Sequence, residues 1–414
     1  MRATETASRL EGQAGRGAGT DAERRAASWL AGELGAGGRE VVVETFWCRP
    51  SWALAQAWHV ALALAGSLVS VASPRLGGAL LLAALVFVVL DALTGSSPGR
   101  RLTPARASQN VVAIAPPAPP IDAAADLPAE RTRLILTANY DAGRAGLAYR
   151  DAFRRACAAL RRASFGLAPG WLGWLAIAIV WLLAVVIVRL QGNHSHMLGI
   201  VQLPPTVGLV LCLALLLELG TADFSPAAGD NGTGVAVALA LAHALDAAPP
   251  RHLDVEVLLA GAGEGGGIGL RRHLRSRRHE RKAANTVVVG IAACSGGNPR
   301  WWLSEGPLVP LRYARRLRQL AQRVAAEEPH LGAAPHRGRG ATPALAARMA
   351  RLPAIAIGCL DRRGLVPRSH QRTDVADAIE AGPIESAVQL GLLLIDAIDA
   401  ALAEPAARVS VTPA

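Results

Sequence analysis

The stretch LILTANYDAGRAG, Leu134–Gly146, joins a short apolar run to a polar loop. A short apolar run that stops at turn residues is typical of a buried strand. In open α/β sheets, sites form at the carboxyl ends of the strands. The loop brings Asn139, Tyr140 and Asp141 to that position, but it contains no histidine. The stretch therefore predicts a strand that delivers an amide, Asn139, to a place where a metal site would need an imidazole.

Strand and helix patterns alternate along most of the remaining chain. Such alternation predicts a sheet with helices on both faces. The fold class that we expect is α/β, with a mostly parallel mixed sheet sandwiched by helices. The segments that carry the pattern are Arg39–Trp47, Ser108–Pro116, Arg133–Asp141, Leu253–Leu274, Asn285–Gly297 and Pro353–Asp361 around strands, and Asp21–Gly38, Gly229–Leu245 and Pro383–Leu402 around helices.

Four apolar runs interrupt this pattern in two pairs. The chain has 414 residues, 51% of them hydrophobic, and its mean hydropathy of +0.29 is high for a soluble enzyme. Each run approaches or reaches the roughly 20 residues that a helix needs to cross a bilayer, and a short link within each pair predicts two transmembrane helical hairpins. Four buried core helices are the alternative reading. The runs are Trp52–Ala72, Leu76–Leu93, Trp171–Val188 and Met197–Leu217.

The distribution of positive charge predicts orientation. The formal net charge is +11, and the arginines crowd beside the apolar runs, notably Arg49, Arg100, Arg101 and Arg106. The positive-inside rule then places the large domain in the cytoplasm, with the lipid bilayer as partner and no nucleic-acid motif. The segment Tyr149–Arg162 is either a basic amphipathic helix on the headgroups or a solvated face. Five cysteines without a CxxC pair indicate free thiols, and the N-terminus lacks the apolar core of a signal peptide.

Together these patterns divide the chain. We expect the α/β domain to start at 1–50, to continue at 96–148 and to finish at 220–405. Between these parts lie the transmembrane hairpins 51–95 and 171–219. The remaining segments are a basic linker at 149–170 and a tail at 406–414.

The non-membrane motifs, in their order, resemble the co-catalytic zinc aminopeptidases, the relatives of bacterial leucyl aminopeptidases, glutamate carboxypeptidase II and the transferrin receptor. The resemblance rests on the opening RLEGQAGRGAGTDAERRAASWLAGELGAGGREVVVETF, on GDNGTGVA, and on LPAIAIGC with SHQRTDVADAIEAGPIESAVQL. It implies a zinc exopeptidase-like fold and a site for two zinc ions. By that resemblance, Asp230 matches the bridging aspartate, Glu264 and His370 match further metal ligands, and Asp141 matches the aspartate that orients the first histidine.

Three positions depart from the family. The first histidine ligand is Asn139, the general-base position is Gly263, and the remaining aspartate ligand falls at Ala293. No Asp or Glu occurs between Glu280 and Glu305 to replace it. Cys294 could substitute as a ligand, although a small buried residue is the commoner reading. Losing a general base alone typically costs ~10²–10⁴ in rate, so no catalytic residue is expected and zinc binding should be weak or absent.

Three functions follow from these readings. The first is a membrane-anchored metallopeptidase-family domain, catalytically impaired or inactive, that binds a peptide or protein partner. The second is an active metal-dependent exopeptidase with a remodelled, single-metal site of Asp230, Glu264 and His370. The third is a transport-like function of the membrane segments, whose polar features are chiefly Gln56, His59 and a break at Pro204–Pro205. Taken singly, Asp230 could cap a helix, Glu264 could be a loop residue and His370 a surface histidine.

Overall fold

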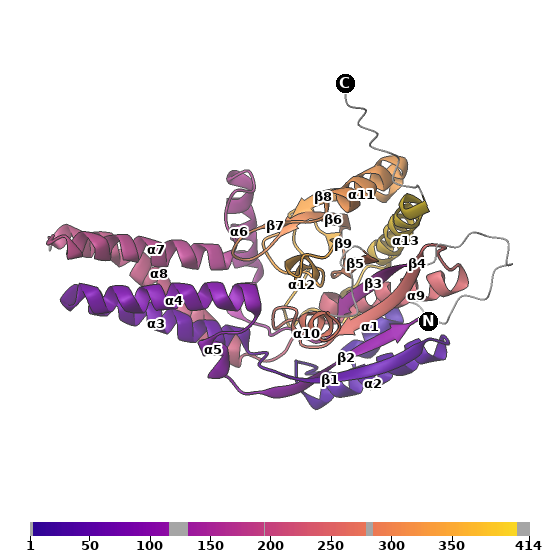
Figure 1. The fold of residues 1–414 in the computed structure, drawn as a ribbon, viewed down its shortest axis with the longest axis horizontal. Helices are drawn as coiled ribbons and strands as arrows, with labels where there is room; N and C mark the ends of the chain where they lie inside the picture. The colour runs from indigo at the N-terminus through magenta and orange to yellow at the C-terminus, as the bar shows by residue number, and fades with distance from the viewer. Residues whose placement is uncertain (1–2, 116–130, 194, 279–284, 404–414) are drawn as a thin grey trace, which may run out of the picture.

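A mixed nine-stranded sheet forms the centre of the molecule (Figure 1). The structure is a computed structural model that describes residues 3–115, 131–193, 195–278 and 285–403, so the Pro- and Ala-rich loop 117–128 and the tail 406–414 lie outside the described residues. The strand order is β1-β2-β4-β3-β5-β9-β6-β7, and β8 pairs with β6. The strands are β1 (Glu40–Cys48), β2 (Arg106–Ile114), β3 (Thr132–Asn139), β4 (Leu253–Ala260), β5 (Thr286–Ile291), β6 (Asn298–Glu305), β7 (Leu311–Arg312), β8 (Ala334–Arg337) and β9 (Ala354–Leu360).

The prediction of a mostly parallel sheet is correct for its centre and for one outer pair. Strands β4, β3, β5 and β9 run parallel, and so do β6 and β8, whereas β1–β2, β2–β4, β6–β9 and β6–β7 are antiparallel. The β1–β2 pair has a simple cause. An up-and-down helical hairpin returns the chain to its starting point, so the end of β1 at Cys48 pairs directly with the start of β2 at Arg106.

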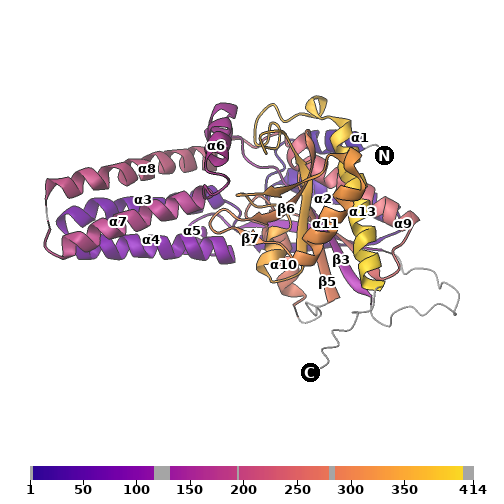
Figure 2. The ribbon, with the colours of Figure 1, turned by 90° about the horizontal axis from the view of Figure 1, so that it is seen from above.

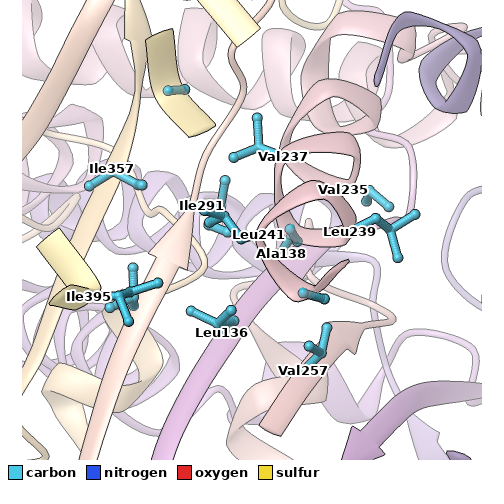
Figure 3. Close-up of a cluster of buried hydrophobic side chains, with 14 of the residues drawn as sticks. Leu136, Ala138, Val235, Val237, Leu239, Leu241, Val257, Ile291, Ile357 and Ile395 are labelled. Carbon is cyan, nitrogen blue, oxygen red and sulfur yellow. The ribbon is translucent and has the colours of Figure 1, made fainter. Parts of the chain in front are cut away.

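Helices cover both faces of this sheet, as the alternating burial of its strands requires. In β3, Leu134, Leu136 and Ala138 join the larger hydrophobic cluster, while Ile135 between them joins the cluster on the opposite face. Figure 3 shows part of the larger cluster between the sheet and its helices. The helices on that face are α1 (Ala3–Glu11), α2 (Asp21–Ala36), α9 (Gly234–Ala247), α11 (Arg315–Glu327) and α13 (Ala381–Ala403), and those on the other are α10 (Ile268–Ser276) and α12 (Leu345–Met349).

Two helical hairpins leave the domain and pack together as a four-helix bundle that projects from one side (Figure 2). The bundle consists of α3 (Trp52–Ala72), α4 (Pro74–Thr94), α7 (Trp171–Leu190) and α8 (His196–Thr221). The four-residue helix α5 (Pro98–Arg101) follows α4, and the helix α6 (Asp151–Ala163) stands across the bundle axis where the bundle meets the domain (Figures 1 and 2). The basic amphipathic segment that we expected at Tyr149–Arg162 is thus helical over most of its length.

Five helices are long and apolar enough to cross a membrane by length and composition, namely the four of the bundle and α13. The fifth has another explanation, because Leu390, Leu394 and Ile395 of α13 lie in the core beside the sheet. The bundle differs, because large apolar side chains such as Leu68, Leu82, Val180 and Leu211 are exposed on it. Exposed apolar patches of that extent mark a contact surface.

The bundle interior is more polar than its sequence suggests. Gln202 accepts a hydrogen bond from Arg189 at 2.7 Å and donates to the Ser67 carbonyl at 2.7 Å. The expected break at Pro204–Pro205 does not occur, since α8 runs without interruption from His196 to Thr221. Proline has no N–H to donate to the carbonyl four residues earlier, so α8 continues although Pro204 and Pro205 cannot donate to the carbonyls of Ile200 and Val201.

A buried ionic cluster ties α10 to the sheet. The ring of His273 lies between two carboxylates, with Nδ1 3.0 Å from Glu44 Oε2 and Nε2 2.8 Å from Glu256 Oε1. Burial alone would lower the pKa of His273, but these two carboxylates outweigh burial and raise it. Burial favours higher pKa values for Glu44 and Glu256, yet His273 holds both below their usual range.

The pH dependence of stability follows from these shifts. A raised histidine pKa contributes stability that is fully present below about 6.5 and is lost as pH rises through the folded pKa. We expect the wild type to lose free energy of unfolding between pH 6 and pH 9, and His273→Gln to be less stable at pH 6 by about 3–5 kcal/mol. Denaturant unfolding of both proteins at the two pH values measures this. An equal loss at pH 6 and pH 9 would contradict an ionic role for His273.

Candidate functional site

The carboxyl ends of the parallel strands meet beside the base of the bundle and assemble the candidate site. Each predicted site residue comes from the end of a strand or from a loop that follows a strand or precedes a helix, as expected for an α/β sheet. The turn η2 (Ala228–Thr233) leads into α9 and supplies one of them. The residues are Asn139 at the end of β3, Asp141 after β3, Glu264 after β4, Ala293 after β5, His370 after β9 and Asp230 in η2.

Asp230, Glu264 and His370 lie together in the structure. His370 Nε2 is 3.3 Å from Glu264 Oε2 and 4.0 Å from Asp230 Oδ2. The other carboxylate oxygen of Glu264 accepts from Asn231 Nδ2 at 2.7 Å, and Asp230 Oδ2 accepts from Ser369 Oγ at 2.6 Å. His370 is therefore ion-paired with Glu264 and lies at the limit of ion-pair distance from Asp230, and Asn231 and Ser369 donate to the two carboxylates, so these side chains form one network.

The electrostatics of this network agree with an ion pair at its centre. Burial would lower the pKa of His370, but Glu264 and then Asp230 outweigh burial and raise it to about 9. Burial would raise the pKa of Glu264, and the His370 charge holds it below its usual value instead. The pKa of Asp230 is raised by burial and by the charge of Glu264. His370 is thus an imidazolium paired with Glu264 at neutral pH.

Asp141 differs from the role that the family resemblance implies. Its carboxylate does not orient a ligand at position 139 but accepts hydrogen bonds from the backbone amides of Gly263 at 2.9 Å and Glu264 at 3.1 Å. Burial, followed by the charges of Glu264 and Glu23, raises its pKa well above the usual range. Asp141 therefore holds the glycine loop that carries Glu264.

The side chain of Asn139 fills the space that a side chain at position 263 would need. A Cβ added at position 263 would lie 2.1 Å from Asn139 Cγ and 2.3 Å from Asn139 Oδ1. Such distances are far below a normal carbon contact. The Asn139 amide therefore fills the place from which a side chain at 263 would start, so the residues at these two positions are sterically linked.

The third departure, Ala293, is buried, and its neighbour faces away from the site. Cys294 belongs to the larger hydrophobic cluster, its sulfur donates to the Ala292 carbonyl at 3.3 Å, and its thiol interacts with Cys359. The side-chain hydrogen bond between Cys294 and Cys359, followed by burial, raises the pKa of Cys294 well above the usual range. The small-buried-residue reading of Cys294 fits this geometry better than the ligand reading.

Three residues of the site escaped the sequence analysis. The carboxylate of Asp374 accepts from the backbone amides of Gly229 and Asp230, both at 2.9 Å, and burial raises its pKa to about 7. The ring of Tyr149 stacks on His370 with centroids 4.1 Å apart. Ser369 was passed over although it directly precedes His370. Ser369 and Asp374 both lie in the segment SHQRTDVADAIEAGPIESAVQL that carried the family resemblance, so the sequence could have indicated them.

Whether this site can bind zinc depends on which side chains are available as metal ligands. A catalytic zinc usually takes three protein ligands and a water, so two ions that share one bridging carboxylate need five ligand residues. Asn139 and Ala293 supply neither imidazole nor carboxylate, and Asp230, Glu264 and His370 are bound to one another. Within the described ranges, no three or more His, Cys, Asp or Glu side chains are grouped so that they could hold a metal ion. The residues present do not fit a two-zinc centre.

Comparisons with known proteins agree with this fold. The zinc aminopeptidase BSAP from Bacillus subtilis superposes with a TM-score of 0.53 at 13% identity, over 97% of this chain and 94% of that one. The glutaminyl cyclase from Porphyromonas gingivalis gives 0.52 at 12% identity, over 95% and 96% of the two chains. The LapA aminopeptidase from Legionella pneumophila gives 0.50 at 11% identity, over 97% and 71%. No curated protein matches by sequence.

The matched part of the sequence is the part that carries most of the site. Residues 218–394 match peptidase family M28 and include Asp230, Gly263, Glu264, Ala293 and His370. The chain thus shares the fold of zinc aminopeptidases and glutaminyl cyclases, and residues 218–394 are similar to peptidase family M28.

Proposed function

We propose that this protein is a membrane-anchored domain of the M28 peptidase fold that binds a ligand and does not hydrolyse peptides. The ligand would bind in the cleft beside Asp230, Glu264 and His370, which we call the old cleft. One observation carries the loss of hydrolysis: Asn139 fills the space from which a base at position 263 would extend. Peptide hydrolysis on this fold needs a polarised carbonyl, an activated water and a proton acceptor together. An amide at 139, a glycine at 263 and an alanine at 293 provide none of the three.

Activity measurements test this proposal. The purified full-length protein, supplied with Zn²⁺, is expected to release no product above background from aminoacyl reporters. It is also expected to cyclise no peptide with an N-terminal glutamine, a reaction included because glutaminyl cyclases share the fold. A zinc aminopeptidase assayed alongside confirms the conditions. Metal-dependent turnover that His370→Ala abolishes, or one tightly held equivalent of zinc that this variant releases, would replace the proposal with the single-metal enzyme.

The exposed apolar surface of the bundle supports the membrane part of the proposal. The rings of Trp52 and Trp171 are in tilted contact, with centroids 5.5 Å apart, at the base of α3 and α7, where an interfacial pair of tryptophans belongs. The helix α6 crosses the bundle axis at that level and carries Arg154, Arg155, Arg161 and Arg162. A bilayer around the bundle would place α6 along the headgroups, with the large domain in the cytoplasm.

Cys157 on α6 provides a test of the orientation. It is exposed, whereas Cys48, Cys294 and Cys359 are buried and Cys212 is half-buried in α8. A membrane-impermeant maleimide is expected to label the protein in inverted membrane vesicles but not in intact cells, and Cys157→Ser should abolish that labelling. Labelling in intact cells would reverse the orientation, and recovery of the protein without detergent would refute the anchor.

A further inference from the structure

A cavity of about 110 Å³ lies between the candidate site and the base of the bundle. Glu264 and His370 line it on the side of the site. Trp52 at the start of α3 and Leu219 near the end of α8 line it on the side of the bundle. The cavity therefore joins the old cleft to the level at which the bundle would enter a bilayer.

The charge still available in this cavity is positive. Glu264 also faces it, but both oxygens of that carboxylate already accept hydrogen bonds or an ion pair, from Asn231 and His370. The Asp141 carboxylate is turned to the backbone amides of the glycine loop. Two guanidinium groups remain, those of Arg106 and Arg144, and neither makes an ion pair with a carboxylate of the described residues.

The two guanidinium groups are near neighbours. Burial, and then the charge of Arg106, lower the pKa of Arg144. Arg144 lies over the ring of Phe224 at 4.4 Å and donates to the Ala222 carbonyl, which leaves it fixed at the cavity wall. Arg106 is exposed at the mouth. The charge of Asp223 acts on Arg144 in the opposite direction, but neither arginine makes an ion pair with a carboxylate of the described residues. Two positive charges on one cavity wall favour an anion with several oxygens, and guanidinium groups match phosphate in geometry.

We infer that Arg106 and Arg144 bind the phosphate group of a membrane phospholipid, with its glycerol and first acyl carbons against Trp52, Leu219 and Phe224. This inference rests on the proposed membrane anchor and names the ligand of the same cleft. The apolar wall distinguishes a lipid from free phosphate, because inorganic phosphate would make no apolar contact with the faces of Trp52, Leu219 and Phe224 that line the cavity. Anionic headgroups also concentrate at a cytoplasmic surface.

Calorimetric titration of the full-length protein in a nonionic detergent tests the inference. The probes are dihexanoyl phosphatidylglycerol, dihexanoylglycerol, which lacks the phosphate, and inorganic phosphate. We expect saturable binding of the phospholipid, little of the other two, and a roughly tenfold to hundredfold weaker phospholipid affinity for Arg106→Gln. Arg25→Gln, an exposed arginine on α2, removes the same charge elsewhere and should leave the affinity unchanged. Partition into micelles is common to all these proteins and cancels in the comparison.

The outcomes separate the two proposals. Equal phospholipid affinity in Arg106→Gln and the wild type overturns the arginine site, and phosphate binding as tight as phospholipid binding overturns the lipid as the source. Arg144→Gln, checked for folding by its thermal transition, must weaken binding as well. Failure of the membrane anchor would be seen in the Cys157 labelling, and retained hydrolysis in the activity assay, because neither measurement depends on the arginines.

Discussion

Gly263→Glu places a carboxylate at the position that the family resemblance assigns to the general base, and we expect it to destabilise the protein without producing metal-dependent turnover. The new Cβ would lie 2.1 Å from Asn139 Cγ. Forcing extra atoms into a packed interior typically costs about 1–3 kcal/mol. The added carboxylate would also stand next to the buried Asp141 without a cation of its own, which adds to the cost. The midpoint of denaturant unfolding should fall accordingly.

A double-mutant cycle tests the steric link that causes this effect. Gly263→Ala should destabilise the wild type, and the loss should shrink in an Asn139→Gly background, because the atoms that the new Cβ meets are then absent. Gly32→Ala in α2 is the matched control, since a Cβ there meets nothing within 4 Å and alanine favours a helix over glycine. Full wild-type stability of Gly263→Glu would show that the Asn139 side chain leaves its place, and the argument for lost hydrolysis would lose its steric basis.

Elements with a clear period were predictable from the sequence. The strand at Arg133–Asp141 is β3, the helix at Pro383–Leu402 is α13, and the run Trp52–Ala72 is α3 to the residue. These elements could be predicted because the spacing of their apolar residues and the residues at their ends are visible in consecutive positions of the sequence. The direction of the strands at the sheet edges could not be predicted from consecutive residues in this way. The antiparallel β1–β2 pair depends on how the α3–α4 insertion returns the chain.

The site was predictable in position and less so in detail. The resemblance to the zinc aminopeptidases singled out Asp230, Glu264 and His370. Glu264 and His370 also follow β4 and β9, and parallel strands bring their carboxyl ends to one edge. What each side chain contacts there depended on packing across distant segments. Asp141 turned to the glycine loop, and Tyr149, expected in a surface helix, stacks on His370. No pattern of neighbouring residues contains those contacts.

The largest missed interaction joins the bundle to the site loop. Arg100 was taken as one of the arginines that face the headgroups, but it is 5% exposed and its Nε lies 2.9 Å from Asp91 Oδ1 of α4. The same guanidinium donates to the Arg49 carbonyl at 2.8 Å and to the Gly265 carbonyl at 2.9 Å. Arg100 therefore connects α4 with the residue next to Glu264. Arg100 therefore cannot contact lipid headgroups. It has to be left out of the arginines from which the orientation was predicted.

Arg100→Ala should be among the most damaging substitutions in the chain. It leaves the Asp91 carboxylate buried without its cation, a change that typically costs about 3–5 kcal/mol, and it frees the Gly265 carbonyl from its donor. Thermal unfolding in detergent should show the loss of stability, and hydrogen exchange should rise in the loop 263–267. The neighbouring Arg101→Ala removes the same charge from an exposed position and should change neither measurement.

A second variant separates the ion pair from the link to the loop. Asp91→Leu with Arg100→Met removes both charges and keeps apolar volume, so it should recover much of the lost stability, as replaced buried ion pairs often do. The loop should remain exposed to exchange in this variant, because methionine cannot donate to the Gly265 carbonyl. Recovery of stability together with normal protection of the loop would mean that the glycine turn holds Glu264 in place by itself. The bundle and the site would then share a boundary without being coupled through Arg100.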